Sequence, residues 1–299
     1  MVETLLLPFV APLDLDALLR FLGARAVPGV ESLVAGTYAR SVRLPHGPGI
    51  LELSAGPGDD IRLRLELADE RDRDEAVRRC RHLLDLDTDP AVVRAALEPD
   101  PVLGPLVAKA PGLRVPGHVD GGEMAVRAVL GQQVSVGTAR TLAGRLTADR
   151  GEPLPFGHPT VTMLFPAAAA IRDADAGMPA SRLRALRAVA AAVDDGLDLT
   201  PEGDRALVER RLLALPGIGP WTASYLAMRS LRDPDAFLPT DVGVRHALDR
   251  LGLPSDHASA AALARRWRPW RSYGLLHLWH SLGAPPRDRG GTPPDRKDV

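Results

Sequence analysis

The sequence predicts an α+β chain in which an antiparallel β-sheet unit with helices is followed by an all-helical unit. Over 61–67 (IRLRLEL), apolar residues alternate with charged ones, as in a strand with one face in water. Beyond about residue 87 no strand pattern remains, and proline and glycine separate segments of helical character. We expect an N-terminal unit over 1–87, a helical unit of two lobes with a cleft between them over 88–284, and a disordered tail over 285–299.

The N-terminal unit is expected to combine strands with two helices. Runs broken by Gly and Pro predict strands at 33–38, 39–44, 50–54 and 61–67. One helix is expected over 14–21. A second is expected over 69–86, because acidic residues fill its first turn and arginines follow later, as the helix dipole favours.

The second unit is expected to consist of helices that proline and glycine delimit. Their expected bounds are 90–97, 122–149, 160–172, 181–194, 201–213, 220–230, 241–251, 257–267 and 270–282. After about residue 285, turn formers and charges occur without periodicity, which is typical of disorder.

Composition limits the classes of function. The 299 residues are 45% hydrophobic and 25% charged, which is ordinary for a soluble globular protein. The single cysteine, Cys80, excludes an intramolecular disulfide, a four-cysteine zinc site and a Cys-ligated iron–sulfur cluster. No apolar run approaches the roughly 20 residues of a membrane helix, and the start lacks a basic signal segment. We therefore expect a cytoplasmic protein that does not bind membranes.

Charge is distributed unevenly along the chain. The net charge of −1, taken as a whole, argues against a polyanionic partner. Residues 1–100 carry 12 Arg against 18 acidic residues, however, so the rest of the chain has a net charge of +5 and could face phosphates. Arginine richness is weak support for this, because it also fits a GC-rich coding bias.

A glycine-containing turn at 212–230 (LLALPGIGPWTASYLAMRS) is the most informative stretch. Gly217 and Gly219 allow a tight turn that a bulky partner can approach closely, and Ile218 can fill the gap between the two helices. Unpaired N–H groups at the start of the second helix bind a phosphate without a basic side chain. The stretch predicts a DNA-binding helix–hairpin–helix that includes Thr222. A plain turn between two packed helices is the alternative.

A carboxylate follows this hairpin. Twenty-two residues after Gly219, in FLPTDVGVR (237–245), Pro239 breaks the chain and Thr240 or Asp241 opens the next helix. Asp241 is the candidate reactive group. Its alternative role is a helix N-cap, which contributes about 1 kcal/mol and needs no chemistry.

Together these motifs resemble the helix–hairpin–helix DNA glycosylase superfamily, in which such a hairpin precedes an aspartate at a helix start by about twenty residues. Within it, four stretches are similar to 3-methyladenine DNA glycosylase II: 112–140, 215–230, 237–245 and 266–281. The resemblance spans nearly the whole chain, including the N-terminal sheet. It implies a hydrolase that initiates base excision repair by releasing damaged, alkylated bases from double-stranded DNA.

Asp241 suits this chemistry. Breaking a base–sugar bond develops positive charge on the deoxyribose, which a nearby carboxylate stabilises. One carboxylate suffices because alkylation at N3 or N7 makes a purine cationic and hence a good leaving group. Aromatic faces attract and stack such a flipped base. Trp221 and Tyr225 share a helix face, and the resemblance assigns Trp279 to the stacking wall, so these three form the expected base pocket. The alternative is that they are core residues.

The resemblance implies three further assignments. Gln133 is the wedge that fills the space of the flipped base, although the family pattern has an apolar residue there. The alternative is that Gln132 and Gln133 are surface residues of a helix. Strand-nicking relatives carry a lysine at the position of Trp221, so no lyase step is expected. A structural monovalent or divalent cation is expected on the backbone carbonyls of Leu213, Leu215 and Gly217, and no other cofactor is expected.

Two rival functions stay open. A non-catalytic DNA-binding or damage-sensing module would use the hairpin without the chemistry of Asp241. A glycosylase for oxidised or mismatched bases would need polar pocket groups and often a lysine. His277 and His280 have a spacing found in metal sites, but no third ligand lies nearby in the sequence. We expect a monomer whose partner is duplex DNA containing damaged bases.

Overall fold

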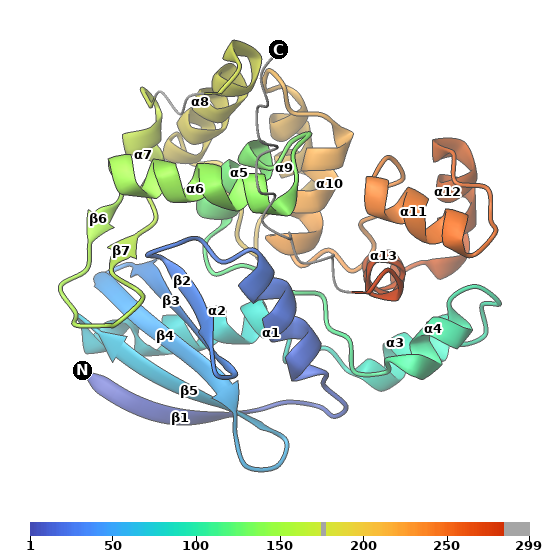
Figure 1. Cartoon of the computed structure of the whole chain (residues 1–299), viewed down its shortest axis with the longest axis horizontal. Helices are drawn as coiled ribbons and strands as arrows, with labels where there is room; N and C mark the ends of the chain where they lie inside the picture. Colours follow the sequence, from blue (N-terminus) through green and yellow to red (C-terminus); the bar gives the residue numbers. More distant parts are fainter. Residues whose placement is uncertain (175–177, 284–299) are drawn as a thin grey trace, which may run out of the picture.

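In the computed structural model, which describes residues 1–174 and 178–283, an N-terminal sheet with two helices lies beside a larger set of helices (Figure 1). This arrangement confirms the predicted α+β fold class. The tail expected at 285–299 lies outside the described residues. None of the described helices is both long and apolar enough to cross a membrane.

The N-terminal sheet has five antiparallel strands in the order β1-β5-β4-β3-β2. Helices α1 (Leu15–Ala24) and α2 (Arg73–Leu84) share a hydrophobic core with it, and a short 3-10 helix, η1 (Glu70–Asp72), precedes α2. The strands are β1 (Val2–Pro8), β2 (Glu31–Val34), β3 (Thr37–Leu44), β4 (Gly47–Ala55) and β5 (Asp60–Leu67).

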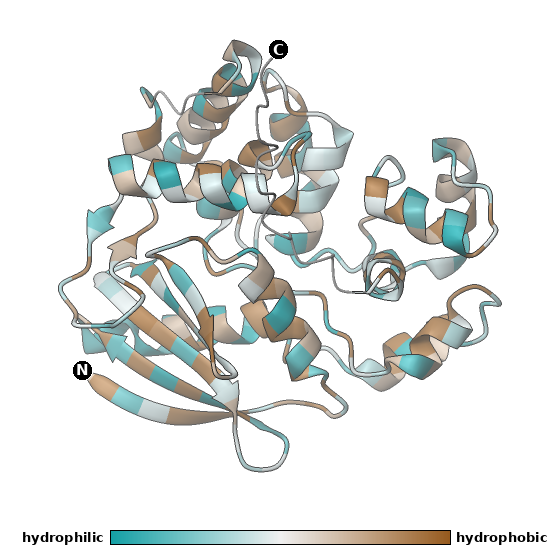
Figure 2. Ribbon diagram, in the orientation of Figure 1, coloured by the Kyte–Doolittle hydropathy of each residue, from teal (hydrophilic) through white to brown (hydrophobic). Residues whose placement is uncertain are grey.

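The alternation predicted for 61–67 is confirmed, because every second side chain of β5 is buried in this core, and stripes of alternating hydropathy cross the sheet in Figure 2. Two details differ. The edge strand β1 was not predicted, since its sequence VETLLLP does not alternate. The strand expected at 33–38 is divided between β2 and β3, because Ala35 and Gly36 adopt positive φ and form a turn.

The helices of the second unit pack around two hydrophobic cores. Helices α5, α6, α8 and α9 contribute to the first core, and α3, α4, α11, α12 and α13 to the second, while α10 contributes to both. Their bounds are α3 (Pro90–Leu97), α4 (Gly104–Lys109), α5 (Gly121–Leu130), α6 (Val136–Arg150), α8 (Ala180–Asp194), α9 (Arg205–Leu213), α10 (Pro220–Arg229), α11 (Val242–Arg250), α12 (His257–Ala264), the 3-10 helix η2 (Arg265–Trp267) and α13 (Arg271–Ser281).

Two helix predictions are wrong. The helix expected over 122–149 is two helices, α5 and α6, because the Ser135 hydroxyl accepts a hydrogen bond from the backbone N–H of Thr138 and starts α6 anew. The helix expected over 160–172 is reduced to α7 (Ala168–Ile171), since Pro166 disfavours helical backbone just before it. The residues ahead of that proline form a two-stranded ribbon instead, so strands do occur beyond residue 87: β6 (Glu152–Pro153) and β7 (Met163–Leu164). Helix α4 was also not predicted.

A buried network of four charged side chains joins the two units. Arg40 of β3 contacts Glu123 of α5 at 2.7 Å and Glu31 of β2 at 3.3 Å. Arg127 of α5 contacts both carboxylates at 2.8 Å. Burial alone would raise the pKa of Glu123, but Arg40, His118 and Arg127 hold it well below its ordinary value. The network is therefore ionised and balanced in charge.

We predict that Glu123→Gln lowers the free energy of unfolding by about 3–5 kcal/mol, because it leaves two buried guanidinium groups facing one carboxylate. Urea unfolding measures this loss. The matched control is Glu152→Gln, which removes an exposed partner of Arg43 and should cost less than about 1 kcal/mol. Equal losses in the two variants would contradict the role given to the buried network.

Buried histidines predict how stability responds to acid. Neither ring nitrogen of His82 has a hydrogen-bond partner within the described residues, and burial, with Arg232 next, lowers the pKa of His82 to about 3. Burial also lowers the pKa of His277 to about 4. The unfolded chain binds these protons near pH 6.5 and the folded chain does not, so stability falls as pH drops from about 6.5 toward 4.

We predict that His82→Leu reduces this acid sensitivity. Between pH 6.5 and 5 the wild type should lose on the order of 1–2 kcal/mol through His82, at about 1.4 kcal/mol per pH unit, and the variant should not. Urea unfolding at the two pH values measures the difference, with the exposed His46→Ala as control. The same pH response in His82→Leu and wild type would refute this origin.

Candidate active site

Asp241 is the N-cap of α11 and also lies at the centre of a cluster of aromatic side chains. Its Oδ1 accepts hydrogen bonds from the backbone N–H of Val244 (3.0 Å) and from Nε1 of Trp279 (2.9 Å). Its Oδ2 accepts one from Nε1 of Trp221 (3.1 Å). Three N–H donors from three segments thus fix the half-buried carboxylate in one orientation. The carboxylate that is the candidate reactive group therefore also makes the helix N-cap that the sequence analysis gave as its alternative role.

The two tryptophans come from different helices and turn their N–H edges toward Asp241. Trp221 lies in the first turn of α10, and its ring stacks on Tyr225 with a centroid distance of 5.1 Å. Trp279 lies in the last turn of α13, and its ring stacks on Phe21 at 6.5 Å. The structure therefore brings together the four residues that the sequence analysis named as carboxylate and base pocket, although both tryptophans also pack against the second core.

Tyr225 differs from the tryptophans in its surroundings. Its hydroxyl accepts a hydrogen bond from Arg229 (2.7 Å). Burial alone would raise the pKa of Tyr225, but Arg229, Arg25 and Arg127 lower it from its ordinary value. The phenol is thus held beside positive charge, behind the Trp221 ring.

Phe21 of α1 and Arg25, the C-cap of this helix, reach this cluster and were missed from the sequence. Phe21 stacks on Trp279, and the guanidinium of Arg25 lies 3.7 Å above the Phe21 ring. The guanidinium of Arg229 lies 5.0 Å from the same ring centre. Sequence spacing gives no sign of these contacts, because α1 is about 200 residues away from α10 and α13 in the chain.

Gly243 is a further residue that the sequence analysis missed. A Cβ atom at this position would lie 2.9 Å from Oδ1 of Asp241 and 2.9 Å from Cδ1 of Trp279. Such distances are too short for real Cβ contacts, so only glycine allows the Trp279 ring to lie this close to the start of α11. The glycine two residues after the aspartate in FLPTDVGVR was the available signal.

The hairpin between α9 and α10 has the expected tight turn. Gly217 is exposed and adopts φ +77°, and α10 starts after Gly219 without a capping side chain. Ile218 is buried in the first core, so its side chain packs between the helices and only its backbone can face a partner. Thr222, which is expected to contact DNA, is 2% exposed, so as for Ile218 only its backbone can face a partner.

Gln132 and Gln133 lie in the turn between α5 and α6, so the alternative that they are surface residues of a helix is wrong. Gln133 is exposed and adopts φ +56°, which is uncommon for a residue other than glycine. The amide of Gln132 donates hydrogen bonds to the carbonyl of Gly217 (3.0 Å) and to Oγ1 of Thr222 (3.1 Å). The turn is therefore attached to the hairpin.

Two places in the molecule offer potential ligands for a metal ion. Among the described residues, Glu31, His118 and Glu123 form a group of three close potential ligands, but Arg40 and Arg127 already neutralise the two carboxylates. At the hairpin, the carbonyl of Gly217 accepts a hydrogen bond from Gln132, and that of Leu215 accepts one from the backbone N–H of Ile218 (3.2 Å). Each carbonyl oxygen has a second lone pair, so this donor set, with the carbonyl of Leu213, fits a hard cation.

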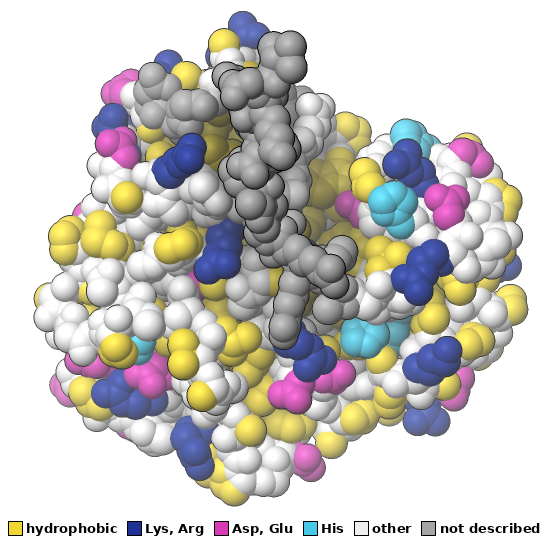
Figure 3. All heavy atoms as spheres, in the orientation of Figure 1, with side chains coloured by type: hydrophobic (Ala, Val, Ile, Leu, Met, Phe, Trp, Pro, Cys, Tyr) yellow, Lys and Arg dark blue, Asp and Glu magenta, His cyan; other side chains and the backbone are white. Residues whose placement is uncertain are grey.

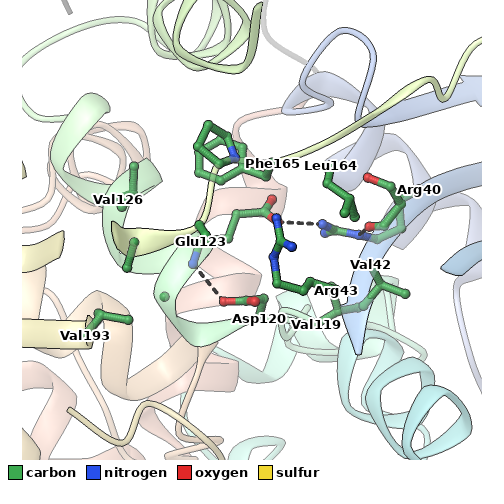
Figure 4. A pocket seen from close by; sticks show the side chains of 15 residues that line it. Arg40, Val42, Arg43, Val119, Asp120, Glu123, Val126, Leu164, Phe165 and Val193 are labelled. Carbon is green, nitrogen blue, oxygen red and sulfur yellow. Dashed lines mark hydrogen bonds and ion pairs between the residues drawn. The ribbon is translucent and has the colours of Figure 1, made fainter. Parts of the chain in front are cut away.

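A pocket lies elsewhere, between β3, α5 and the segment before α7 (Figure 4). Of its charged residues, Arg40 pairs with Glu123, Arg43 pairs with Glu152 outside the pocket, and Asp120 accepts a hydrogen bond from the backbone N–H of Glu123. None of the residues that line it belongs to the Asp241 cluster. Basic side chains are scattered over the face of the molecule in Figure 3 rather than gathered in one patch.

Comparison with known proteins gives relatives along the whole chain. Residues 4–120 match the AlkA N-terminal domain family. The chain is 36% identical over 283 residues to DNA-3-methyladenine glycosylase 2 of Escherichia coli, covering 92% of this chain and 96% of that protein. It is 46% identical over 286 residues to a Mycobacterium tuberculosis protein named a probable bifunctional transcriptional activator/DNA repair enzyme AlkA, covering 94% of this chain.

The chain spans only 58% of the length of that mycobacterial relative. Among solved structures, a 3-methyladenine DNA-glycosylase from Archaeoglobus fulgidus superposes with a TM-score of 0.81 at 19% identity, over 93% of this chain and 97% of that one. This likeness shows a shared fold. Identity to the E. coli protein over nearly both full lengths shows that the chain belongs to the DNA-3-methyladenine glycosylase 2 (AlkA) family.

Proposed function

We propose that this chain is a monofunctional DNA glycosylase that flips alkylated bases of the 3-methyladenine and 7-methylguanine type out of duplex DNA and hydrolyses their N-glycosidic bond. One observation carries the proposal: the carboxylate of Asp241, at a helix start that follows a glycine hairpin, is held by the N–H groups of Trp221 and Trp279. The name of the E. coli relative, DNA-3-methyladenine glycosylase 2, supports the substrate class.

Asp241 acts as the catalytic carboxylate in this proposal. As the bond to the base breaks, positive charge develops on the deoxyribose, and a fixed negative charge nearby stabilises it without having to reorganise. The three hydrogen bonds from Val244, Trp221 and Trp279 supply that fixed position. The same carboxylate can orient the attacking water.

The aromatic rings around Asp241 form the base pocket. An indole face attracts a cationic base with about 0.5–2 kcal/mol, and it stacks a flipped base of any charge. Trp221, Tyr225 and Trp279 provide these faces. A neutral oxidised base would gain less from them, which favours alkylated bases over that rival.

The presence of Trp221 also decides whether strand cleavage can follow base release. A strand-nicking glycosylase needs an amine that forms a Schiff base with the sugar, and an indole cannot do so. The proposal is therefore base release that leaves the DNA backbone intact.

DNA contacts follow from the turns next to the site. The amides after Gly219 bind a backbone phosphate, and Gln133 enters the minor groove as the wedge that replaces the flipped base. The amide of Gln133 can also hydrogen-bond to the base on the opposite strand that has lost its partner. A cation on the carbonyls of Leu213, Leu215 and Gly217 would add positive charge opposite the phosphate. The partner is damaged duplex DNA in the cytoplasm, bound by a monomer.

We predict that Asp241→Asn lowers base release from methylated duplex DNA by at least about 100-fold, because the amide carries no charge to stabilise the deoxyribose cation. Released bases are identified by chromatography, and strand breaks are counted on a denaturing gel. The wild type should give free base without breaks. Release by the variant at the wild-type rate would instead favour the non-catalytic rival, with a contaminating activity as the source of free base.

We predict that Gly243→Ala lowers base release about tenfold or more while the fold stays intact. The added methyl group must push Trp279 or Asp241 aside, and a small misplacement of reacting groups is costly. Tryptophan fluorescence and single-turnover rates report the two effects. The control is Gly157→Ala, where a Cβ meets no atom within 4 Å. Unchanged rates in Gly243→Ala would show that the Trp279 contact has no part in catalysis.

A further inference from the structure

We propose that Gln132 is a positioning residue that couples the DNA-binding hairpin to the wedge loop, defined as residues 131–135 between α5 and α6. Because of this coupling, the hairpin binds the DNA backbone at the same time as the wedge loop flips the base. The inference rests on the proposed function. It concerns Gln132, whose side chain points into the protein, and is separate from the wedge role of its neighbour Gln133.

The two glutamines of the loop have opposite surroundings. Gln133 is exposed and adopts φ +56°. Gln132 is half-buried, and its amide nitrogen donates to two acceptors, the carbonyl of Gly217 at 3.0 Å and Oγ1 of Thr222 at 3.1 Å. Both hydrogens of the amide nitrogen are thereby used in hydrogen bonds to the hairpin.

One acceptor lies in the phosphate-binding turn and the other in the helix that follows it. Gly217 is in the turn itself, with φ +77°, and Thr222 is in the first turn of α10. They are 85 and 90 residues from Gln132 in the chain. One amide therefore attaches the wedge loop to both ends of the segment whose N–H groups would face the phosphate. Burial of Thr222 keeps water away from its hydroxyl.

This attachment has a physical consequence for base flipping. A left-handed backbone at a residue other than glycine persists only where its surroundings hold it. Loss of the two hydrogen bonds of Gln132 would let the loop around Gln133 sample other conformations. The loop would then have to become ordered during flipping. Phosphate binding uses backbone groups of the hairpin and would change little. The coupling therefore predicts a loss in flipping that exceeds the loss in binding.

The test uses two substitutions that keep the size of the side chain. Gln132→Met removes the donor without adding charge next to the phosphate-binding turn, whereas Thr222→Val removes one acceptor only. Three quantities are measured on the full chain: Kd for undamaged duplex, the single-turnover rate of base release from methylated duplex, and base flipping from the fluorescence of 2-aminopurine beside the lesion. Thr141→Val, at an exposed threonine of α6, is the matched control.

We expect Gln132→Met to lower the release rate and the flipping signal about tenfold, as for loss of hydrogen bonds that hold the loop, with Kd within about twofold of wild type. Thr222→Val should show a smaller loss of the same kind, and Thr141→Val none. The proposal is overturned if Gln132→Met flips and cuts like wild type, or if Kd weakens as much as flipping. Should Gln132→Met not fold, Thr222→Val decides between these outcomes. If the wild type itself releases no base, it is the proposed function that is wrong.

Discussion

Arg127 makes the contact on which the arrangement of the two units depends. It pairs with Glu31 of the sheet unit and Glu123 of its own helix, and it also donates to the backbone carbonyl of Arg25 at 2.7 Å. That carbonyl lies at the end of α1, the helix that brings Phe21 onto Trp279. Because unpairing a buried charge costs several kcal/mol, the sheet unit cannot shift without breaking the network. The N-terminal unit thus helps to shape the aromatic cluster.

In the proposed function, one carboxylate, that of Asp241, has both a structural and a chemical role. A helix N-cap needs an acceptor at a defined place, and the catalysis proposed here needs a fixed negative charge. Capping of Val244 by Oδ1 leaves Oδ2 to accept from Trp221 alone. The rigid start of α11 is therefore what holds the carboxylate in register with the two indoles.

The sequence reveals the part of this site that local motifs encode. Hairpin glycines and the spacing to Asp241 pointed to the carboxylate, the helix after the hairpin pointed to Trp221, and the resemblance to a family assigned Trp279. Phe21 could not be found in this way, because its contact depends on how two distant units pack. The break of the helix expected over 122–149 was also hidden, since nothing in the residue type of Gln133 requires a left-handed backbone.

The two tryptophans can hold the carboxylate and still receive a base, because an indole N–H lies in the plane of its ring. When a ring donates its N–H to Asp241, the hydrogen bond lies in the ring plane, so the two π faces point away at right angles to that bond. Trp221 uses one face against Tyr225, and Trp279 uses one face against Phe21. Both rings remain half-buried rather than enclosed. In the proposed function, their exposed surfaces are where a flipped purine stacks, within reach of the charge that their edges hold in place.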